Sequence, residues 1–394
     1  MNIFKLVLLS GLLTSNICYS TGASQILNEA ISITDKIAAK YSDEIRNEFY
    51  QCDSNAMITV TDNLATLHTV KYFGTTISID IFNLPQGTEK QVLCNALNVI
   101  QEYHYLASNY STYPHVTNIK TINNTPNVVH HIDPQLSQLI ASSIDWHEKS
   151  HGYFNIALSP VIDLWRQKRF ECDKNQGKDC SIPTKNALDN ASQFTDIKQI
   201  NYNPDKKTIV IKPGMSLDLG GIAKGWMTEK VFTQLRLDGA SQFMINAGGN
   251  IRHLGLHPEN RQFVTAIEDP LCKKSQYQLP QCASFEGQYH ELITGQNITV
   301  VSSGNYLRYF EVNGKQYHHL IDPKTNYPKP EGVATTVVLK GNQIFADVLS
   351  TTLFLMPLEE AIEYVNNNSF IEAVWYLDEE GNKIKSDNFN SVSK

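Results

Sequence analysis

The order of the predicted strands and helices is the feature that most restricts the fold of this chain. Short runs rich in β-branched and aromatic residues, such as 67–73 and 75–81, predict strands. Apolar residues at helical spacing predict helices over 90–108, 136–150 and 344–356. Strands and helices do not alternate regularly, which favours an α+β fold over a doubly wound parallel sheet. We therefore expect mixed, largely antiparallel sheets with flanking helices.

The first twenty residues have the pattern of a secretory signal peptide. Lys5 precedes the short apolar run 6–13, and small or polar residues follow as far as Ser20. The run is shorter than the about 20 apolar residues that a membrane-spanning helix needs. We expect residues 1–20 to be removed from an exported, soluble protein. A buried N-terminal element and a lipoprotein modified at Cys18 are the less favoured alternatives.

The cysteines fit an oxidising compartment. The chain has seven, and loss of the signal peptide would leave six. An even number in an exported protein indicates disulfides, and a metal site is disfavoured because no C-x-x-C pair is present. Two pairs are close in sequence and the third pair is what remains, although six cysteines allow 15 connectivities. The favoured pairs are Cys172 with Cys180, Cys272 with Cys282, and Cys52 with Cys94.

Composition excludes other classes. Hydrophobic residues make up 41% and charged residues 19% of the 394, which is unlike a disordered chain. The 33 basic and 40 acidic residues give a net charge of −7, which argues against a broad nucleic-acid surface. We divide the chain into the signal peptide 1–20, an N-terminal extension 21–66 and one large body 67–394.

The segment 217–226, LDLGGIAKGW, carries the strongest chemical signal. It lies between a predicted strand at 208–211 and a predicted helix at 228–237. Its glycines let the backbone approach a ligand, and the helix start favours an anionic group, whose charge Lys224 would offset. The spacing matches neither the P-loop nor the G-x-G-x-x-G fingerprint. By itself, the segment fits a turn-rich connection equally well.

Two further segments are weaker on their own. A glycine pair in 246–250 follows a predicted strand and is more typical of a bulge. In 317–323, a histidine near a carboxylate could act as a general base. Because side chains alternate along a strand, we expect only one of His318 and His319 to face a pocket and the other to lie on the surface.

Asp347 and Thr351 form a candidate metal-binding pair. They are four residues apart near the start of a predicted helix, so they share one face. A carboxylate and a hydroxyl are oxygen ligands suited to Mg²⁺, which also takes water and substrate phosphates. The alternative for the isolated segment is a helix cap and a packed threonine.

Taken together and in this order, these segments resemble the ApbE family of FAD:protein FMN transferases, also called flavin transferases. The resemblance runs from about Lys71 to Met356. Departures from the family pattern are Phe73 for Met, Asn155 and Asn305 for Asp, and Asn326 for Gly; none removes a proposed metal ligand. The segments that carry the resemblance are 73–75, 111–113, 152–155, 218–225, 246–249, 267–270, 303–306, 319–323 and 346–351.

The resemblance implies two lobes around a flavin-nucleotide cleft and an exported, periplasmic enzyme, with inner-membrane association through a partner or a lipid anchor as an alternative. It implies Mg²⁺-dependent transfer of FMN from FAD onto a Thr or Ser hydroxyl of a target protein, with release of AMP. The implied targets are redox subunits of Nqr- and Rnf-type complexes. No nucleic-acid partner is expected.

The resemblance also implies roles for individual residues. His319 would be the base at the transferred phosphoryl group. The implied Mg²⁺ ligands are the Gly221 carbonyl and the side chains of Asp347, Ser350 and Thr351. The residues implied to contact FAD or to line the flavin nucleotide site are Phe73, Tyr113, Tyr153, Phe154, Asn155, Asp218, Lys224 and Ile321.

Two other functions use the same residues. An FAD pyrophosphatase would hydrolyse FAD to FMN and AMP, and AMP release without a target protein would distinguish it. A non-catalytic periplasmic FAD-binding protein would keep FAD intact in the presence of Mg²⁺. The presence of Asp347, Thr351 and His319 argues against this last alternative.

Overall fold

The computed structural model describes residue 52 and residues 56–341, 344–378 and 380–393. These belong to one compact unit that begins at Cys52. The predicted signal peptide and most of the predicted extension therefore lie outside the described residues. The body begins before the predicted boundary at 67, because strand β1 (Met57–Val60) already pairs with β2 (Leu64–Thr69).

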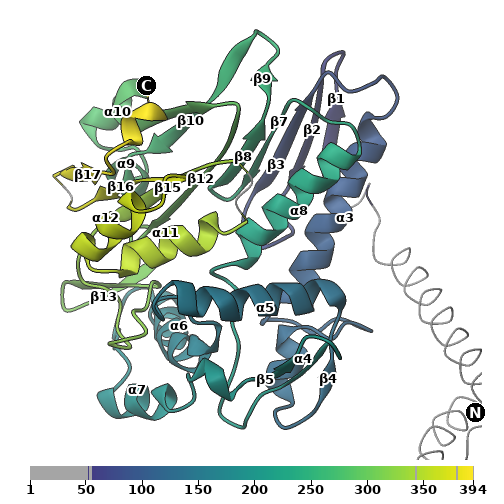
Figure 1. Cartoon of the computed structure of the whole chain (residues 1–394). Coiled ribbons are helices and arrows are strands. Elements are labelled where there is room, and N and C mark those ends of the chain that lie inside the picture. Colours follow the sequence, from purple (N-terminus) through teal and green to yellow (C-terminus); the bar gives the residue numbers. More distant parts are fainter. Residues whose placement is uncertain (1–51, 53–55, 342–343, 379, 394) are drawn as a thin grey trace, which may run out of the picture. The chain divides into compact units, whose positions relative to one another are not determined.

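A large antiparallel sheet forms the centre of the body (Figure 1). Each strand pairs with its neighbours in antiparallel register, which confirms the predicted α+β class with largely antiparallel sheets. The strand order is β1, β2, β3 (Ile77–Phe82), β7 (Phe243–Ala247), β8 (Asn250–Leu254), β12 (Asn297–Gly304), β15 (Ala334–Lys340), β16 (Ile371–Tyr376) and β17 (Lys383–Lys385).

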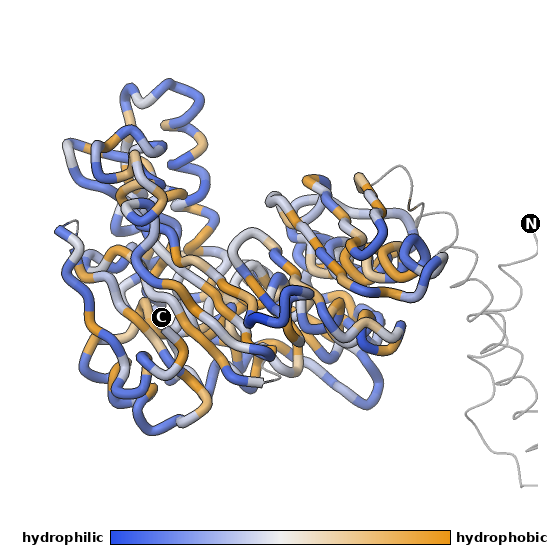
Figure 2. Tube along the Cα trace, turned by 90° about the horizontal axis from the view of Figure 1, so that it is seen from above, coloured by the Kyte–Doolittle hydropathy of each residue, from blue (hydrophilic) through white to orange (hydrophobic). Residues whose placement is uncertain are grey.

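Helices cover one face of this sheet. They are α3 (Glu89–Ala107), α8 (Ala223–Leu237), α11 (Ala346–Leu355) and α12 (Leu358–Asn366). Alternate strand residues such as Ile77, Ile79 and Ile81 are fully buried under them. Figure 2 shows hydrophobic residues concentrated along the strands and helices of the body. Burial of this apolar face is the main favourable contribution to the fold.

A smaller sheet packs on the opposite face of the large one. It consists of β9 (Leu256–His257), β10 (Arg261–Glu268) and β11 (Tyr289–Gly295). Ile267 and Ile293 meet Ile298 and Val300 of β12 in a second apolar cluster. The strand β12 is therefore buried on both faces, and its residues alternate between two different cores.

The second lobe lies below the large sheet in Figure 1. Its longest helices, α5 (Pro134–Lys149) and α6 (Ser159–Lys174), both begin with proline in the first turn, where the missing N–H has no helical partner. The other elements are α4 (Ile119–Asn124), β4 (His130–His131), η1 (Ile156–Leu158), α7 (Lys185–Ser192), η2 (Ile197–Gln199), β5 (Asn201–Asn203), β6 (Thr208–Val210), β13 (Tyr309–Val312) and β14 (Lys315–His318).

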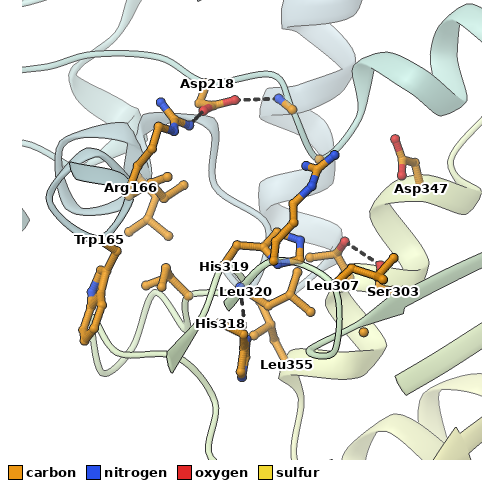
Figure 3. A pocket seen from close by; sticks show the side chains of 18 of the residues that line it. Trp165, Arg166, Asp218, Ser303, Leu307, His318, His319, Leu320, Asp347 and Leu355 are labelled. Carbon is orange, nitrogen blue, oxygen red and sulfur yellow. Dashed lines mark hydrogen bonds and ion pairs between the residues drawn. The ribbon is translucent and has the colours of Figure 1, made fainter. Parts of the chain in front are cut away.

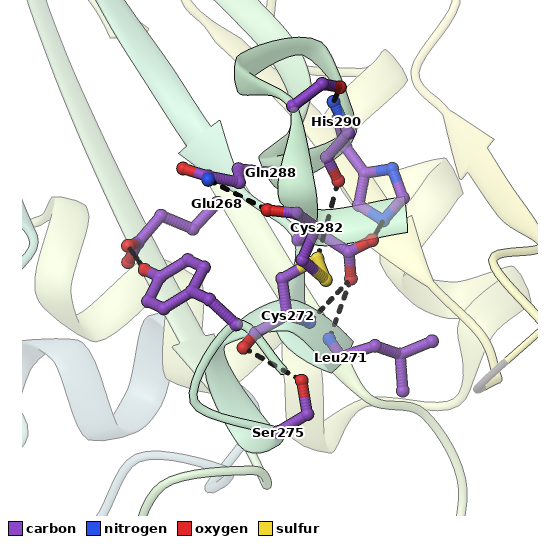
Figure 4. The surroundings of a disulfide bond; sticks show 11 residues. Glu268, Leu271, Cys272, Ser275, Cys282, Gln288 and His290 are labelled. Atoms are coloured by element: carbon purple, nitrogen blue, oxygen red, sulfur yellow. Dashed lines mark hydrogen bonds and ion pairs between the residues drawn. A yellow bond between two sulfur atoms is a disulfide. The ribbon is translucent and has the colours of Figure 1, made fainter. Parts of the chain in front are cut away.

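The three predicted disulfides are confirmed. Figure 4 shows Cys272–Cys282 closing the connection between β10 and β11, where Asp269 caps α9 (Pro270–Lys274) by accepting from the Leu271 amide at 2.7 Å. The connection also contains η3 (Pro280–Ala283) and α10 (Phe285–Gln288), and η4 (Phe389–Ser391) lies near the C-terminus. The other two bonds are Cys52–Cys94 and Cys172–Cys180. None of the described helices is long and apolar enough to cross a membrane.

Candidate active site

A cavity of about 330 Å³ lies where the sheet-covering helices α8 and α11 meet α6 and the β13–β14 hairpin. Figure 3 shows Asp218 and Arg166 on one side of it, Asp347 on the other, and His319 between them. Most of the residues singled out in the sequence line this one cavity. They are Tyr153, Phe154, Asn155, Asp218, Gly221, Lys224, His319, Ile321, Asp347 and Thr351.

Three of the predicted residues do not line the cavity. The backbone amide of Phe73 donates to His104 Nδ1 at 3.2 Å, and the Tyr113 hydroxyl lies 3.3 Å from His104 Nε2, so both belong to an aromatic cluster on α3. Ser350 is fully buried behind the wall. The roles proposed for these residues stay predictions.

Asp347 lies where the first turns of two helices meet. It is the second residue of α11, and its carboxylate accepts from the backbone amide of Gly225 in the first turn of α8 at 3.2 Å. Lys224 Nζ is 3.3 Å from the same carboxylate. The Asp347 side chain, which is 7% exposed, thus pairs an N–H that α8 cannot satisfy itself.

Only glycine fits at position 225. A Cβ there would lie 2.8 Å from Asp347 Cβ, closer than two carbon atoms can approach. The helix begins at Ala223, five residues before the predicted start at 228. The prediction differs because glycine is unfavourable inside a helix, and Gly225 lies in the first turn of α8. The unfavourable helix propensity of glycine is accepted because it brings α8 against α11.

A group of hydroxyls adjoins Asp347. Ser303 Oγ on β12 lies 2.8 Å from Ser350 Oγ and 3.1 Å from Thr351 Oγ1. Ser303 and Thr351 both line the cavity, whereas Ser350 reaches it only through Ser303. Ser303 was not among the predicted site residues, because a serine in a strand gives no signal until the sheet places it beside α11.

The residues around Asp347 fit a Mg²⁺ ion. They offer oxygen atoms from one carboxylate and neighbouring hydroxyls, and Gly221 places a further backbone segment in the same cavity wall. In this structure the Lys224 ammonium neutralises the Asp347 carboxylate. Within the described residues no group of three or more His, Cys, Asp or Glu could hold a metal. A cation here would therefore need ligand phosphates and water as well.

The opposite side of the cavity is organised around Asp218. Its carboxylate accepts from Arg166 Nη2 at 2.6 Å, from Asn109 Nδ2 at 2.9 Å and from the Gly220 amide at 2.7 Å. Arg166 also pairs with Asp163 at 2.6 Å. Asp218 therefore holds the glycine-rich segment to α6 and has little remaining capacity for a ligand.

Three arginines line the cavity. Arg166 and Arg169 come from α6, and Arg308 comes from the loop between β12 and β13. Burial lowers the pKa of Arg169, and Arg308 lowers it further. None of the three was predicted as a site residue, although the spacing of Arg166 and Arg169 on a helix indicates that they share a face.

The two histidines after the Asn313–Gly314 turn are both in the cavity wall. His318 is 5% exposed, and it donates from Nε2 to the Lys329 carbonyl at 2.7 Å and accepts from the Leu320 amide at Nδ1. The prediction that one histidine lies on the surface is thus wrong. The strand β14 ends at His318, so strand alternation does not extend to His319.

His319 has an unusual environment. Its Nδ1 is buried and has no hydrogen-bond partner among the described residues. Burial, with the nearby charge of Arg308 and then His318, lowers its pKa to about 3. The imidazole is therefore neutral at physiological pH and has a nitrogen lone pair that can accept a proton.

The aromatic wall is formed mainly by Tyr153 and Phe154, which are 5% and 6% exposed. Lys324 Nζ lies 3.6 Å from the centre of the Tyr153 ring, a cation–π contact. Asn155 donates to the Thr195 carbonyl at 2.9 Å and caps η1 through its side-chain oxygen, so its amide already has protein partners. The proposed nucleotide contact of Asn155 is not tested by this arrangement.

The fold and the site define a two-lobed α+β protein with a cation-compatible, basic cavity. The sequence model of the ApbE family matches residues 73–375. This chain belongs to the ApbE family. The solved structures similar to it include the ApbE protein of Thermotoga maritima, with a TM-score of 0.70 at 23% identity over 84% of this chain and 99% of that one. The flavin transferase ApbE of Vibrio cholerae gives a TM-score of 0.66 at 22% identity, over the same shares of the two chains.

Sequence relatives share a name. The FAD:protein FMN transferase of Haemophilus influenzae is 30% identical over 241 residues, which are 60% of this chain and 65% of that protein. The protein of the same name from Vibrio cholerae is 25% identical over 296 residues, 75% of this chain and 82% of that protein. The match to the Haemophilus protein thus covers just under two thirds of its length.

Proposed function

We propose that this chain transfers FMN from FAD onto a Thr or Ser hydroxyl of a target protein, using Mg²⁺ and releasing AMP. The relatives named FAD:protein FMN transferase support the reaction class. The observation that carries the proposal is a cavity that combines an oxygen-rich face at Asp347 and Thr351 with a neutral His319 whose Nδ1 has no hydrogen-bond partner among the described residues.

The residues around the cavity divide the work of phosphoryl transfer, which is mainly positioning and charge stabilisation. Asp347 and Thr351, with the Gly221 carbonyl and Ser350 behind them, would hold Mg²⁺. That ion would neutralise charge on the pyrophosphate and on the departing AMP. Lys224, whose ammonium lies 3.3 Å from the Asp347 carboxylate, would contact a phosphate oxygen. Tyr153 and Phe154 offer flat apolar surface to an aromatic ring.

His319 would accept the proton of the target hydroxyl. The hydroxyl oxygen forms a bond to the FMN phosphorus, the bond between this phosphorus and the AMP oxygen breaks, and AMP departs with that oxygen. The low pKa of His319 is set by burial and then by Arg308. A bound pyrophosphate offsets the arginine charge, so it raises this pKa towards the range in which a base is effective.

Incubation with FAD, Mg²⁺ and a threonine-containing acceptor peptide tests the proposal. We expect one FMN adduct on the threonine, detected by mass spectrometry, and one AMP released for each adduct. An alanine-substituted peptide is the matched control and should stay unmodified. AMP release with no adduct on a permissive peptide would identify a pyrophosphatase, and FAD left intact would exclude both reactions.

The partner and the compartment are parts of the same proposal. The targets would be redox subunits of Nqr or Rnf type, and the chain would act in the periplasm after export. The three disulfides support an oxidising compartment. Inner-membrane association would come from the partner or from a lipid anchor. Fractionation of cells that express the full chain, with N-terminal sequencing of the mature protein, tests both points.

A further inference from the structure

The strand β8 presents an unpaired amide to the cavity. Asn250 is its first residue, is 2% exposed and lines the cavity wall. Its side-chain oxygen is buried without a hydrogen-bond partner in the described part of the chain, and its amide nitrogen, which is not fully buried, donates to none of the described residues. A buried amide oxygen without a partner is costly, so such groups in native proteins call for an explanation.

The position of Asn250 is fixed by the sheet. Its backbone lies opposite Ala247 on β7 and Val301 on β12, so both edges of β8 are paired here. The preceding turn needs glycine, because Gly248 has a φ of +60° and a Cβ there would collide with Thr75. The side chain is thus held on one face of the sheet and cannot swing towards solvent.

That face runs along α8. Two residues after Asn250, Arg252 donates from Nε to Glu229 at 2.6 Å and lies 3.7 Å from the centre of the Phe232 ring, both on α8. Asn250 occupies the corresponding place beside the first turn of α8, at Gly225. Because residue 225 has no side chain, α8 gives Arg252 a partner but gives Asn250 none.

Asn250 and Asp347 lie on the same side of Gly225. A Cβ built on Gly225 would be 2.8 Å from Asp347 Cβ and 3.7 Å from Asn250 Oδ1. The amide therefore adjoins the part of the cavity where α8 and α11 begin and where Lys224 lies. Two helix starts and an ammonium favour an anionic ligand, and an amide NH₂ group can donate two hydrogen bonds to it.

We propose that Asn250 is a substrate-binding residue that donates from its amide nitrogen to the phosphate oxygens of the bound dinucleotide, next to Lys224 and Asp347. The identity of the dinucleotide rests on the proposed function. The amide nitrogen of Asn250 then has no acceptor in the state without ligand, and the phosphate supplies one. An amide suits this place because it adds no negative charge beside Asp347.

Binding of FAD and of ADP, each with Mg²⁺, measured by calorimetry tests this proposal. Asn250→Asp should weaken the binding of both ligands about tenfold or more, because a carboxylate repels phosphate where the amide donated to it. Asn246→Asp is the matched control. Asn246 lies on β7 just before the same turn, does not line the cavity, and accepts from the Gly249 amide, which a carboxylate oxygen also does. This control should bind like the wild type.

Asn250→Leu separates binding from folding. Replacing an unpaired buried amide by an apolar residue of similar shape should leave the unfolding temperature unchanged or higher, while ligand binding still weakens. A fall in unfolding temperature with unchanged affinity would assign Asn250 a structural role and overturn the proposal. Tighter Mg²⁺-dependent binding by Asn250→Asp would also overturn it, because the amide oxygen would then face the cation.

The outcomes distinguish this inference from the proposed function. If the wild type binds both ligands, the Asn250 variants weaken binding and no FMN adduct forms on a permissive peptide, the function fails and the inference stands. If all proteins bind with equal affinity but the adduct forms, the inference fails and the function stands. A wild type that binds neither FAD nor ADP overturns both.

Discussion

Asp218 and Asp347 stand at opposite sides of one cavity in contrasting environments. Asp218 accepts three hydrogen bonds of 2.6 to 2.9 Å, one of them from Arg166. Asp347 accepts from Lys224 and from the Gly225 amide over 3.2 to 3.4 Å. Shorter contacts with an ionised partner are the stronger ones. The difference suggests that Asp218 builds the wall, whereas Asp347 keeps capacity for a ligand.

The two sides also differ in what surrounds the carboxylates. Arg166 of α6 lies on the Asp218 side, whereas hydroxyls and helix starts line the Asp347 side. The first is rigid and basic, and the second is suited to a cation with phosphate. His319 lies between them and responds to both, through the charge of Arg308 and through the proposed reaction.

The largest expected effect is that of Asp347→Asn. Losing the only carboxylate of the proposed Mg²⁺ site should reduce FMN transfer about 1000-fold or more, because the ion supplies several kcal/mol of charge stabilisation. The unfolding temperature should change little, since the present contacts of Asp347 are long. Asp189→Asn on α7, an exposed residue that does not line the cavity, is the matched control. Transfer within tenfold of the wild type would show that Asp347 is not the metal ligand.

His319→Ala comes next. Removing the base should slow transfer about 100- to 10,000-fold, as is typical for general base catalysis, with FAD affinity nearly unchanged. Rates at saturating FAD, measured by adduct formation, give the comparison. The exposed His151 provides a control alanine substitution. Equal loss of FAD binding and rate would instead make His319 a binding residue.

Asp218→Asn should act mainly on stability. It removes the charge that faces Arg166 and leaves a partly buried guanidinium with a weaker partner, which costs about 1–3 kcal/mol. Urea unfolding should report this loss, while the rate at saturating FAD falls less than tenfold. If Asp218→Asn slowed transfer as much as Asp347→Asn without loss of stability, the contrast between the two aspartates would be wrong.

The smallest effect on the rate at saturating FAD should come from Arg308→Met, which should change the pH profile. Burial lowers the pKa of His319 first, and Arg308, His318 and Arg169 lower it further. Removing one cation makes the imidazolium less unfavourable, so the pKa rises by less than about one unit. The base must be neutral, and therefore kcat/KM should fall at a higher pH in the variant than in the wild type. If the acidic limb of the pH profile lies at the same pH in the variant and the wild type, Arg308 does not affect the pKa of the base.

Much of the site could be predicted because its signals are local. The glycines of 217–226, the four-residue spacing of Asp347 and Thr351, and the order of the segments are properties of the sequence itself. The structure brings Gly221, His319, Asp347 and Thr351 to one cavity. The disulfides were predictable for the same reason, because the short loops of Cys172–Cys180 and Cys272–Cys282 favour their own closure.

The rest depends on distant segments. Phe73 and Tyr113 pack around His104 because α3 offers them an aromatic partner. Ser303 joins Thr351 only after β12 and α11 have packed. His318 can be buried because its Nε2 donates to the carbonyl of Lys329, eleven residues later in the chain. No local pattern contains these contacts.

By itself, the sequence determined which elements form and which residues could react. The periodicity of apolar residues, the glycines and the paired oxygen ligands are set by neighbours along the chain. Only the tertiary structure decided how each carboxylate is used. Arg166 pairs with Asp218 because α6 packs beside the glycine-rich segment. Asp347 keeps capacity for a ligand because Gly225 lets α8 approach α11 without supplying a side chain as a partner. The physical reason is that hydrogen bonding of a buried polar group depends on which partners packing brings within about 3 Å.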